Sequence, residues 1–386
     1  MKIDDVISSK IKSIPPSGIR RFFDLINEMK DAISLSIGEP DFDTPWSIRE
    51  EGIFSLEKGR THYSPNAGFQ ELRKEITNYM LRKFDLVYKP EETIVTVGGS
   101  EAIDLILRSV IDPGDEVIIP EPSFVAYSPC TLLAGGIPVA VPLKVENNFK
   151  LTADELLEAI SEKTKALVLP FPCNPTGATM DREDLAPIAE VLRNKDIVVI
   201  SDEIYAELTY GSKHVSIASF DDMKDRTVVI NGFSKAYAMT GWRLGFACGP
   251  KALIDIMIKI HQYAIMSSPT IAQFSGIEAL KNCDREIEKM NLEYQRRKRV
   301  IVDGLNNYGL ECFEPFGAFY CFPSVKKSGL DSERFAEKLL MQEKVAVVPG
   351  TAFGKSGEGF VRICYAASME NIFEALKRIK RFMESI

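Results

Sequence analysis

A lysine in an apolar setting is the first residue of this sequence that could carry chemistry. Lys235 lies in the stretch NGFSKAYAMTGWRLGF, residues 231–246, with Phe233 and Ala236 beside it and Arg243 eight residues further on. The stretch RTVVI, which we expect to be a strand, leads directly into it. An amine among apolar residues loses its proton more readily than a solvated amine. Lys235 is therefore a candidate nucleophile.

Polar residues follow other predicted strands in the same way. Asp202 follows the run VVIS, with Tyr205 three residues on, and Asn174 stands in the loop FPCNPTG after ALVLP. The turn VGGSEA follows TIVTV and starts a predicted helix, whose free N–H groups and positive dipole end suit an anion. Because α/β enzymes place their chemistry at the carboxyl ends of parallel strands, we expect these groups to lie near Lys235.

Pyridoxal phosphate is a cofactor that needs all of these groups together. It requires a lysine for its aldehyde, a carboxylate for its ring nitrogen, donors for its ring oxygen and an anion site for its phosphate. Asp202 would hold the ring nitrogen protonated, and Asn174 and Tyr205 would donate to the ring oxygen. Phe124, in EPSFVAY, would stack on the ring. The phosphate would bind at the helix start and beside the lysine, at Gly99, Ser100, Glu101, Ala102, Ser234 and Arg243.

The elements that must position these residues alternate along the middle of the chain. The predicted strands are residues 93–97, 116–120, 137–143, 166–170, 197–201, 227–230 and 244–248. The predicted helices between them include residues 101–111, 125–136, 154–160 and 182–194. Alternating helices and nearly continuous apolar strands predict an α/β fold with a mostly parallel sheet that is covered on both faces.

The end of the chain has a different pattern. A charged helix over about residues 284–307 precedes the predicted strands GAFYCFP, VAVVPG and FVRICYA and two amphipathic helices, which predict a smaller α+β unit. With 386 residues, the chain exceeds what one core usually holds. We expect a large cofactor-binding domain over residues 45–280, a small domain over 281–386, and an N-terminal arm over 1–44 that packs with the small domain. The arm includes a predicted helix over residues 17–30.

The chain resembles the pyridoxal-phosphate-dependent aminotransferases of class I/II, fold type I, in their aspartate and aromatic aminotransferase-like branch. The matching stretches are LSIGEPDFDTP (35–45), THYSPNAG, VGGSEA, NPTG, SDEIY, SKAYAMTGWRLG and FVRICYA (360–366), in family order over nearly the whole length. The resemblance implies that Arg362 binds the substrate α-carboxylate, with Gly38 and Asn174. It also implies a homodimer in which Tyr63 reaches the cofactor phosphate of the neighbouring subunit.

The implied reaction transfers the amino group of an L-amino acid, aspartate or an aromatic one, to a 2-oxo acid such as 2-oxoglutarate. It runs through an aldimine on Lys235 with ping-pong kinetics. Ser100 stands where some dicarboxylate-specific members have a lysine, so the preferred donor stays open, with Arg20 or Lys12 as other sources of a positive charge. Two alternatives share the fold: a carbon–sulfur lyase or related lyase, and a non-catalytic ligand-sensing protein.

Composition excludes several other classes. The net charge is −8, and no basic run is long enough to follow a nucleic-acid backbone or an anionic membrane. No apolar run approaches the roughly 18 residues of a membrane span. The seven cysteines form no CxxC pair, which favours free thiols in the cytoplasm, and the three histidines lack the spacing of a metal site. We therefore expect small-molecule substrates and no metal.

Overall fold

Apolar, β-branched strands form the centre of the larger part of the molecule. The structure is a computed structural model, and it describes residues 2–12, 14–15, 29 and 31–386. The described residues form a seven-stranded sheet in the order β2-β8-β7-β6-β5-β3-β4. These strands are β2 (Thr93–Thr96), β3 (Glu116–Glu121), β4 (Ile137–Pro142), β5 (Thr164–Leu169), β6 (Val198–Asp202), β7 (Thr227–Gly232) and β8 (Gly245–Cys248).

Most neighbouring strands of this sheet run parallel. The pairs β3–β4, β3–β5, β5–β6 and β6–β7 are parallel, whereas β8 is antiparallel to both β2 and β7. The mostly parallel α/β fold expected from the sequence is confirmed. Parallel strands end at one edge of a sheet, so the residues that follow β3, β5, β6 and β7 are brought together there.

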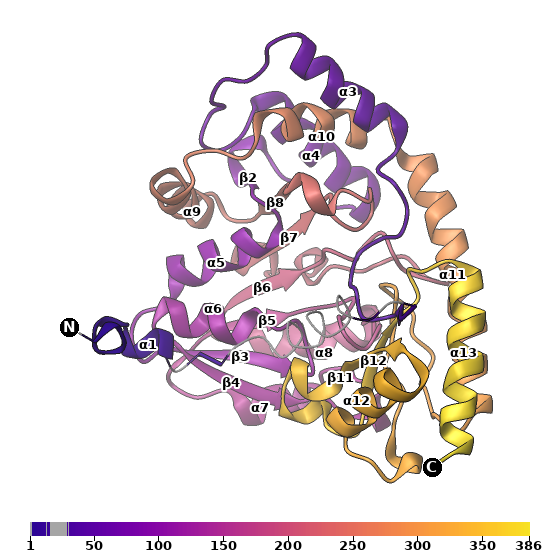
Figure 1. Cartoon of the computed structure of the whole chain (residues 1–386). Helices are drawn as coiled ribbons and strands as arrows, with labels where there is room; N and C mark the ends of the chain where they lie inside the picture. The colour runs from indigo at the N-terminus through magenta and orange to yellow at the C-terminus, as the bar shows by residue number, and fades with distance from the viewer. Residues whose placement is uncertain (1, 13, 16–28, 30) are drawn as a thin grey trace.

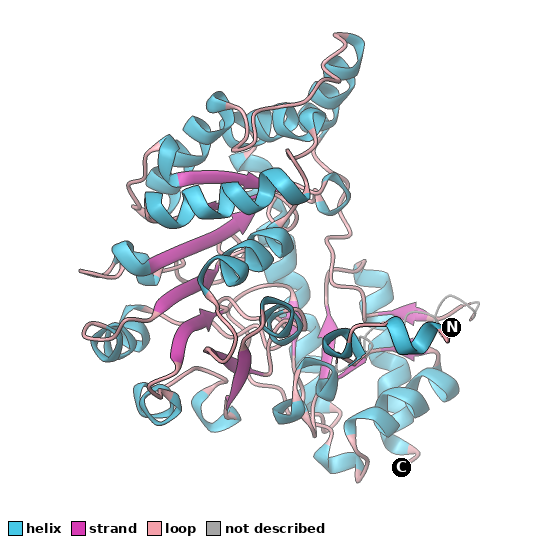
Figure 2. Ribbon diagram, turned by 90° about the vertical axis from the view of Figure 1, so that its left-hand side faces the viewer, coloured by secondary structure: helices cyan, strands magenta, loops and turns pink. Residues whose placement is uncertain are grey.

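Helices cover both faces of the large sheet, as Figures 1 and 2 show. The sheet alternates its side chains between two apolar clusters: Ile94, Ile200 and Ile230 face one side, and Val95 and Val229 the other. The first face packs on α5 (Gly99–Val110), α6 (Tyr127–Ala134) and α9 (Lys251–Ala264). The other face packs on α4 (Gln70–Phe84), α7 (Ala153–Ala159), α8 (Arg182–Leu192) and α10 (Thr270–Asn282), with α3 (Trp46–Glu57) beside α10.

The C-terminal part forms a smaller α+β unit. Its antiparallel sheet has the order β11-β12-β9, with β9 (Tyr320–Cys321), β11 (Val348–Pro349) and β12 (Val361–Cys364). Three helices surround it, α11 (Asp284–Asn307), α12 (Ser332–Glu343) and α13 (Met369–Glu384), and α11 lies beside α13 (Figure 1). Aromatic and aliphatic side chains of these elements share one buried cluster with Leu35 and Tyr205. That cluster joins this unit to the loop after β6.

The N-terminal residues contact both parts. The strand β1 (Ile33–Ser34) pairs in parallel with β10 (Val345–Ala346), which ties the chain before the large sheet to the C-terminal unit. The short helix α1 (Ser9–Lys12) lies instead against α6, where the Lys10 Nζ atom donates to the Leu133 carbonyl at 3.4 Å. Of the helix predicted over residues 17–30 only residue 29 is described, and Arg20 lies outside the described residues. The domain limits stay a prediction.

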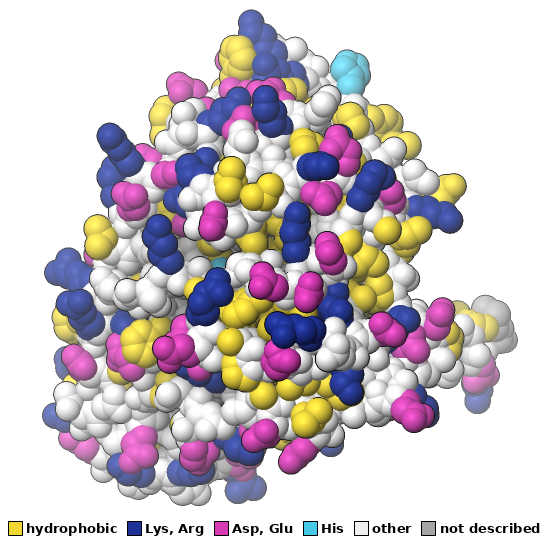
Figure 3. Space-filling model, turned by 180° about the vertical axis from the view of Figure 1, so that it is seen from behind, with side chains coloured by type: hydrophobic (Ala, Val, Ile, Leu, Met, Phe, Trp, Pro, Cys, Tyr) yellow, Lys and Arg dark blue, Asp and Glu magenta, His cyan; other side chains and the backbone are white. Residues whose placement is uncertain are grey.

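The lengths of the helices and the charges on the surface test whether a membrane or a nucleic acid is a partner. In the described part of the chain, no helix combines the length and the apolar composition that crossing a membrane requires. Lysine and arginine side chains alternate with carboxylates over the face of the molecule in Figure 3, without a continuous basic track on that face. Such a mixed surface does not favour a polyanion there.

Candidate active site

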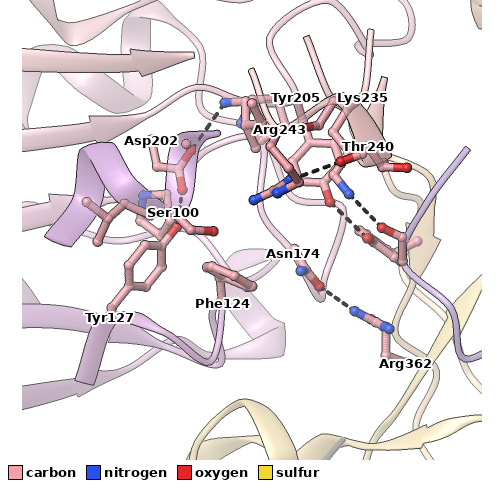
Figure 4. A pocket seen from close by; sticks show the side chains of 18 residues that line it. Ser100, Phe124, Tyr127, Asn174, Asp202, Tyr205, Lys235, Thr240, Arg243 and Arg362 are labelled. Atoms are coloured by element: carbon pink, nitrogen blue, oxygen red, sulfur yellow. Dashed lines mark hydrogen bonds between the residues drawn. The ribbon is translucent and has the colours of Figure 1, made fainter. Parts of the chain in front are cut away.

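A cavity of about 280 Å³ opens at the carboxyl edge of the large sheet. Figure 4 shows its labelled side chains converging from both sheets: Asp202, Tyr205 and Lys235 come from the large sheet's edge, and Arg362 from β12. Most of the predicted site residues line this cavity. They are Gly38, Gly99, Ser100, Phe124, Asn174, Asp202, Tyr205, Ser234, Lys235, Arg243 and Arg362.

Lys235 follows the buried strand β7, and its amine points into the cavity (Figure 4). Its Nζ atom donates a hydrogen bond of 2.6 Å to the carbonyl oxygen of Gly38. Burial lowers the pKa of the Lys235 amine to about 8, and the positive charges of Arg362 and Arg243 act in the same direction. A larger fraction of this amine than of an ordinary lysine is therefore unprotonated near neutral pH, which favours its use as a nucleophile or a proton acceptor.

Asp202 is the last residue of β6 and is buried at the cavity wall. Its Oδ2 atom accepts a hydrogen bond of 2.6 Å from the Tyr127 hydroxyl, and its Oδ1 atom accepts one of 3.2 Å from the Ile204 N–H. Burial raises the pKa of the carboxyl, and both hydrogen bonds oppose that rise. Within the described residues no lysine, arginine or histidine pairs with it, so the carboxylate lacks a cationic partner.

A candidate anion site lies where α5 begins. Gly98 has a φ of 77°, which favours glycine, and a Cβ atom there would come within 2.8 Å of the Arg243 guanidinium. The exposed Ser100 side chain and the free N–H groups of the first turn of α5 face the same space as Ser234. Arg243 donates to the Thr240 carbonyl at 3.0 Å. These donors can surround a phosphate group.

Arg362 is buried on β12 at the opposite side of the cavity. Its Nη1 atom donates to Asn174 Oδ1 at 2.9 Å, and its Nη2 atom donates to the Ser36 carbonyl. The Nε atom is buried without a hydrogen-bond acceptor among the described residues, and no carboxylate there pairs with the guanidinium. A buried guanidinium without a carboxylate partner favours binding of an anion, and a carboxylate can accept two parallel hydrogen bonds from it.

Two aromatic side chains complete the walls. Phe124, in the loop after β3, meets Tyr127 edge to face with ring centroids 5.7 Å apart. The Tyr205 hydroxyl lies 2.8 Å from the Tyr320 hydroxyl, and both phenols are buried. Phe124 and Tyr205 therefore offer an aromatic face and a hydroxyl to whatever fills the cavity.

Three predicted site residues lie elsewhere. The Glu101 carboxylate turns away from the cavity and binds the Val97 N–H and His261 Nδ1, the latter at 2.7 Å. Ala102 is fully buried in the apolar cluster between α5 and the sheet. The Tyr63 side chain is 83% exposed beside Ile265, away from the cavity of its own chain.

Sequence reasoning missed Tyr127, Thr240 and Tyr320, which also line the cavity. Tyr127 stands three residues after Phe124 at the start of α6, a spacing that places both side chains on one side of a helical turn. That signal was available in EPSFVAY. Tyr320 comes from β9 of the smaller sheet, and no local pattern places that strand beside β6.

The fold and site are those of an α/β enzyme that binds an aldehyde-bearing, phosphorylated cofactor beside a carboxylate substrate. The family model described as aminotransferase class I and II matches residues 30–379. The chain belongs to this family, and it is a pyridoxal-phosphate-dependent aminotransferase of fold type I.

Individual relatives extend this comparison over almost the whole chain. A putative aminotransferase, YugH, of Bacillus subtilis is 54% identical over 98% of each chain. The aspartate aminotransferase of Pyrococcus abyssi is 45% identical, again over 98% of each chain. The crystal structure of an aromatic aminotransferase from Pyrococcus horikoshii is 44% identical and superposes with a TM-score of 0.90, over 95% of this chain and 99% of the other.

The residues present fit pyridoxal phosphate. The buried Asp202 carboxylate without a cation suits a protonated ring nitrogen, and the donors around Gly98 suit a phosphate. By contrast, no group of three or more His, Cys, Asp or Glu side chains in the described part could hold a metal ion.

Proposed function

We propose that this enzyme transfers the amino group of L-aspartate or an aromatic L-amino acid to 2-oxoglutarate, with the cavity at Lys235 as its active site. The observation that carries the proposal is the buried Arg362 guanidinium, which faces the cavity without a carboxylate partner in the described chain. Amino acids and 2-oxo acids share an α-carboxylate, and one arginine can therefore hold both substrates in turn.

The cofactor is held by side chains from five separate segments. Lys235 binds the aldehyde carbon, Asp202 the ring nitrogen, and Asn174 and Tyr205 the ring oxygen. Phe124 covers one face of the ring. The phosphate binds the first turn of α5 at Gly99 and Ser100, together with Ser234 and Arg243. Glu101 and Ala102 support this turn from the side away from the cavity, because neither side chain reaches the cavity.

When bound, pyridoxal phosphate supplies an aldehyde that accepts the amino group and a ring that withdraws electrons from the substrate Cα atom. Arg362, with Asn174 and the backbone at Gly38, fixes the substrate carboxylate and thereby the direction of the Cα–H bond. The Lys235 amine, freed when the substrate amino group takes its place at the aldehyde carbon, would take the Cα proton and later give it back. Because one product leaves before the second substrate binds at the same arginine, the kinetics are ping-pong.

The donor amino acid depends on what faces its side chain. Ser100 is exposed at the start of α5 and carries no charge, and Lys12 lies on α1, where its amine donates to the Asp4 carbonyl away from the cavity. Aromatic side chains line the cavity at Phe124, Tyr127, Tyr205 and Tyr320. The similar proteins include both an aspartate and an aromatic aminotransferase, so both donor types belong to the proposal.

The reaction is tested by following products with aspartate, alanine, phenylalanine, tyrosine and kynurenine as donors. Beyond the single equivalent of oxo acid per site that the first half-reaction releases, glutamate and the donor's oxo acid are expected in equal amounts, and only when 2-oxoglutarate is present. Release of ammonia or a thiol without an oxo-acid acceptor would identify a lyase instead. The ranking of kcat/KM values then gives the preferred donor.

The assembly we propose is a homodimer in which Tyr63 completes the partner's phosphate site. Tyr63 and Tyr263 are each 83% exposed, and Ile265 and Met266 are 48% and 45% exposed. Tyr63 and Ile265 line one surface hollow, and Tyr263 and Met266 flank Ile265 in sequence; we call these four residues the apolar patch. The Asn66 side chain, near Tyr63 in sequence, donates to the Met266 carbonyl at 2.7 Å. Exposed aromatic and aliphatic side chains in one area are typical of a subunit interface.

A cytoplasmic location is the remaining part of the proposal. All seven cysteines are free thiols, and five of them are buried completely or nearly so in the apolar interior, including Cys173 and Cys248. Free thiols persist in a reducing compartment. Cell fractionation should recover the enzyme with other cytoplasmic proteins, and recovery in a membrane or secreted fraction would contradict the proposal.

A further inference from the structure

Two tyrosine hydroxyls meet at the wall of the cavity. The oxygens of Tyr205, in the loop after β6, and Tyr320, on β9, lie 2.8 Å apart. Tyr320 is fully buried and Tyr205 is 4% exposed. Burial raises the pKa of each hydroxyl well above its ordinary value, so both remain neutral phenols in the working range of the enzyme. Tyr320 has no part in the reaction as proposed above.

A count of protons restricts how the pair can act. Each hydroxyl has one proton to donate, and a single hydrogen bond between them uses one of the two protons. If Tyr205 donates to Tyr320, it has no proton left for the cofactor ring oxygen. If Tyr320 donates to Tyr205, the Tyr205 proton is free for that oxygen.

The surroundings favour Tyr320 as the donor. The Arg362 guanidinium lies over the Tyr320 ring, with its central carbon 4.5 Å from the ring centroid. A nearby positive charge makes a hydroxyl a better donor and a poorer acceptor; Arg362 also acts on Tyr205, but it is the Tyr320 ring that its guanidinium covers. No other acceptor for the Tyr320 proton is found among the described residues, whereas Tyr205 is within reach.

We propose that Tyr320 is a positioning residue: its hydroxyl donates to Tyr205 and thereby fixes and strengthens the hydrogen bond from Tyr205 to the cofactor ring oxygen. This inference rests on the proposed function of the site. A hydroxyl that already accepts a hydrogen bond is a stronger donor, because the two bonds polarise each other. The chain of two hydroxyls would draw negative charge from the ring oxygen.

The consequence can be measured on the nitrogen that joins Lys235 to the bound cofactor. Negative charge on the ring oxygen stabilises a proton on that nitrogen, so a stronger donor to the oxygen lowers the pH at which the proton leaves. Among the described residues, the charged and titratable groups that face the tyrosine pair are Arg362 and Cys364 on β12, Lys235 after β7, Tyr127 on α6, and Glu39. The substitution Tyr320→Phe leaves all five in place.

The test compares the holoenzyme with Tyr320→Phe, Tyr205→Phe and the double variant. The midpoint pH of the change in cofactor absorbance should rise by about half a unit in Tyr320→Phe, the size expected for weakening one hydrogen bond. It should rise further in Tyr205→Phe. The double variant should match Tyr205→Phe alone, because Tyr320 acts only through Tyr205. Equilibrium dialysis should also show a modest loss of cofactor affinity in Tyr320→Phe.

Tyr294→Phe is the matched control. Tyr294 is fully buried in the same apolar cluster, and its hydroxyl has no hydrogen-bond partner among the described residues. Loss of the Tyr294 hydroxyl should leave the midpoint pH unchanged. A shift in Tyr294→Phe equal to that in Tyr320→Phe would show that a change of packing alone moves the midpoint. Thermal unfolding of each variant verifies that the fold persists.

Three results would overturn the inference: an unmoved midpoint in Tyr320→Phe, a double variant that exceeds Tyr205→Phe, or an effect confined to KM. The last of these would mean that Tyr320 donates to the substrate instead. These outcomes are separate from a failure of the proposed function. If the wild-type enzyme binds the cofactor but transfers no amino group, the proposed reaction is wrong. The absorbance titration would still show whether Tyr320 acts through Tyr205.

Discussion

The surroundings of Lys235 lower the pKa of the amine that we propose as the nucleophile. Its neighbours remove it from water and leave only the Gly38 carbonyl as its hydrogen-bond acceptor among the described residues, so the charged form is poorly stabilised. With a pKa of about 8, the neutral fraction rises as the pH rises through 8. A lysine with the ordinary pKa would be less than about 1% neutral at that pH.

The first prediction follows from that pKa. Apoenzyme mixed with pyridoxal phosphate should capture it through Lys235 at a rate that increases with pH and levels off above about pH 8 to 9. Stopped-flow absorbance measures this rate, and Lys235→Ala gives the background. A rate that still climbs steeply between pH 9 and 10.5 would mean that the amine has an ordinary pKa.

The second prediction concerns Arg362. Arg362→Ala should lower kcat/KM by about 100- to 1000-fold for amino and oxo acids alike, because two hydrogen bonds from a charged group to the carboxylate are lost. Arg362→Lys should recover little, since an ammonium cannot offer the planar fork. Steady-state kinetics with both substrates measure the effect, and Arg334→Ala, on the exposed surface of α12, is the control. A loss restricted to one substrate would contradict a shared carboxylate site.

At the residue scale, sequence reasoning found groups that stand next to strand ends and missed those that do not. Asp202 and Lys235 could be found because a buried strand precedes each of them. Tyr320 could not, because its position depends on how a two-residue strand of the smaller sheet packs beside Tyr205. The direction of the Glu101 side chain could not be predicted from local sequence either, because Glu101 contacts His261 on α9, which is distant in sequence.

At the scale of elements, the start of α5, where we propose that the phosphate binds, is held by contacts on its side away from the cavity. Glu101 connects three elements: it belongs to the first turn of α5, accepts from Val97 after β2, and contacts His261 on α9. His261 is fully buried, so this interaction is shielded from water. The turn that presents Gly99 and Ser100 thus owes its position to a side chain outside the cavity.

The third prediction tests that connection. Glu101→Ala should weaken cofactor binding by about tenfold and cost about 1 to 3 kcal/mol of unfolding free energy, because the Val97 N–H and the His261 side chain lose their partner. Equilibrium dialysis and denaturant unfolding measure the two effects. Asp104→Ala is the matched control on the same helix, where the carboxylate pairs with Arg108 at the surface. Unchanged cofactor affinity in Glu101→Ala would disprove the connection.

Elements in the large sheet were predictable because each strand is a short β-branched run between turns. The strand expected over residues 197–201 is found as β6 (Val198–Asp202), and the charged helix expected over about residues 284–307 is α11 (Asp284–Asn307). Strand order was not predictable in the same way. The antiparallel insertion of β8 between β2 and β7 depends on contacts between segments about 150 residues apart, such as Thr93 with Cys248.

At the scale of the whole molecule, the proposal to test is that two chains form a dimer. The apolar patch around Tyr63 and Tyr263 exposes side chains that monomers usually cover. The fourth prediction is a particle of twice the 43.1-kDa chain mass in analytical ultracentrifugation. Replacing Ile265 and Met266 together by aspartate should produce monomers with weakened cofactor binding, because charges would be buried at the interface. A wild-type protein that sediments as a monomer would contradict the proposed dimer.

The last prediction asks which chain supplies Tyr63 to each site. Lys235→Ala and Tyr63→Ala variants should each have little activity alone, the first because it lacks the amine and the second because it lacks a phosphate contact. If Tyr63 acts across the interface, a mixed dimer contains one site with Lys235 from one chain and Tyr63 from the other. Random reassociation after mild denaturation should then restore up to about a quarter of the wild-type activity.

The control for that mixing experiment pairs Lys235→Ala with Arg362→Ala. Both residues line the same cavity within one chain, so no mixed dimer of these two variants contains a complete site, and activity should stay at the level of the separate variants. Restoration by the Tyr63 mixture alone would place Tyr63 in the partner's site. If neither mixture gains activity while mixed dimers are present, Tyr63 does not complete the neighbouring site, and its 83% exposure would need another explanation.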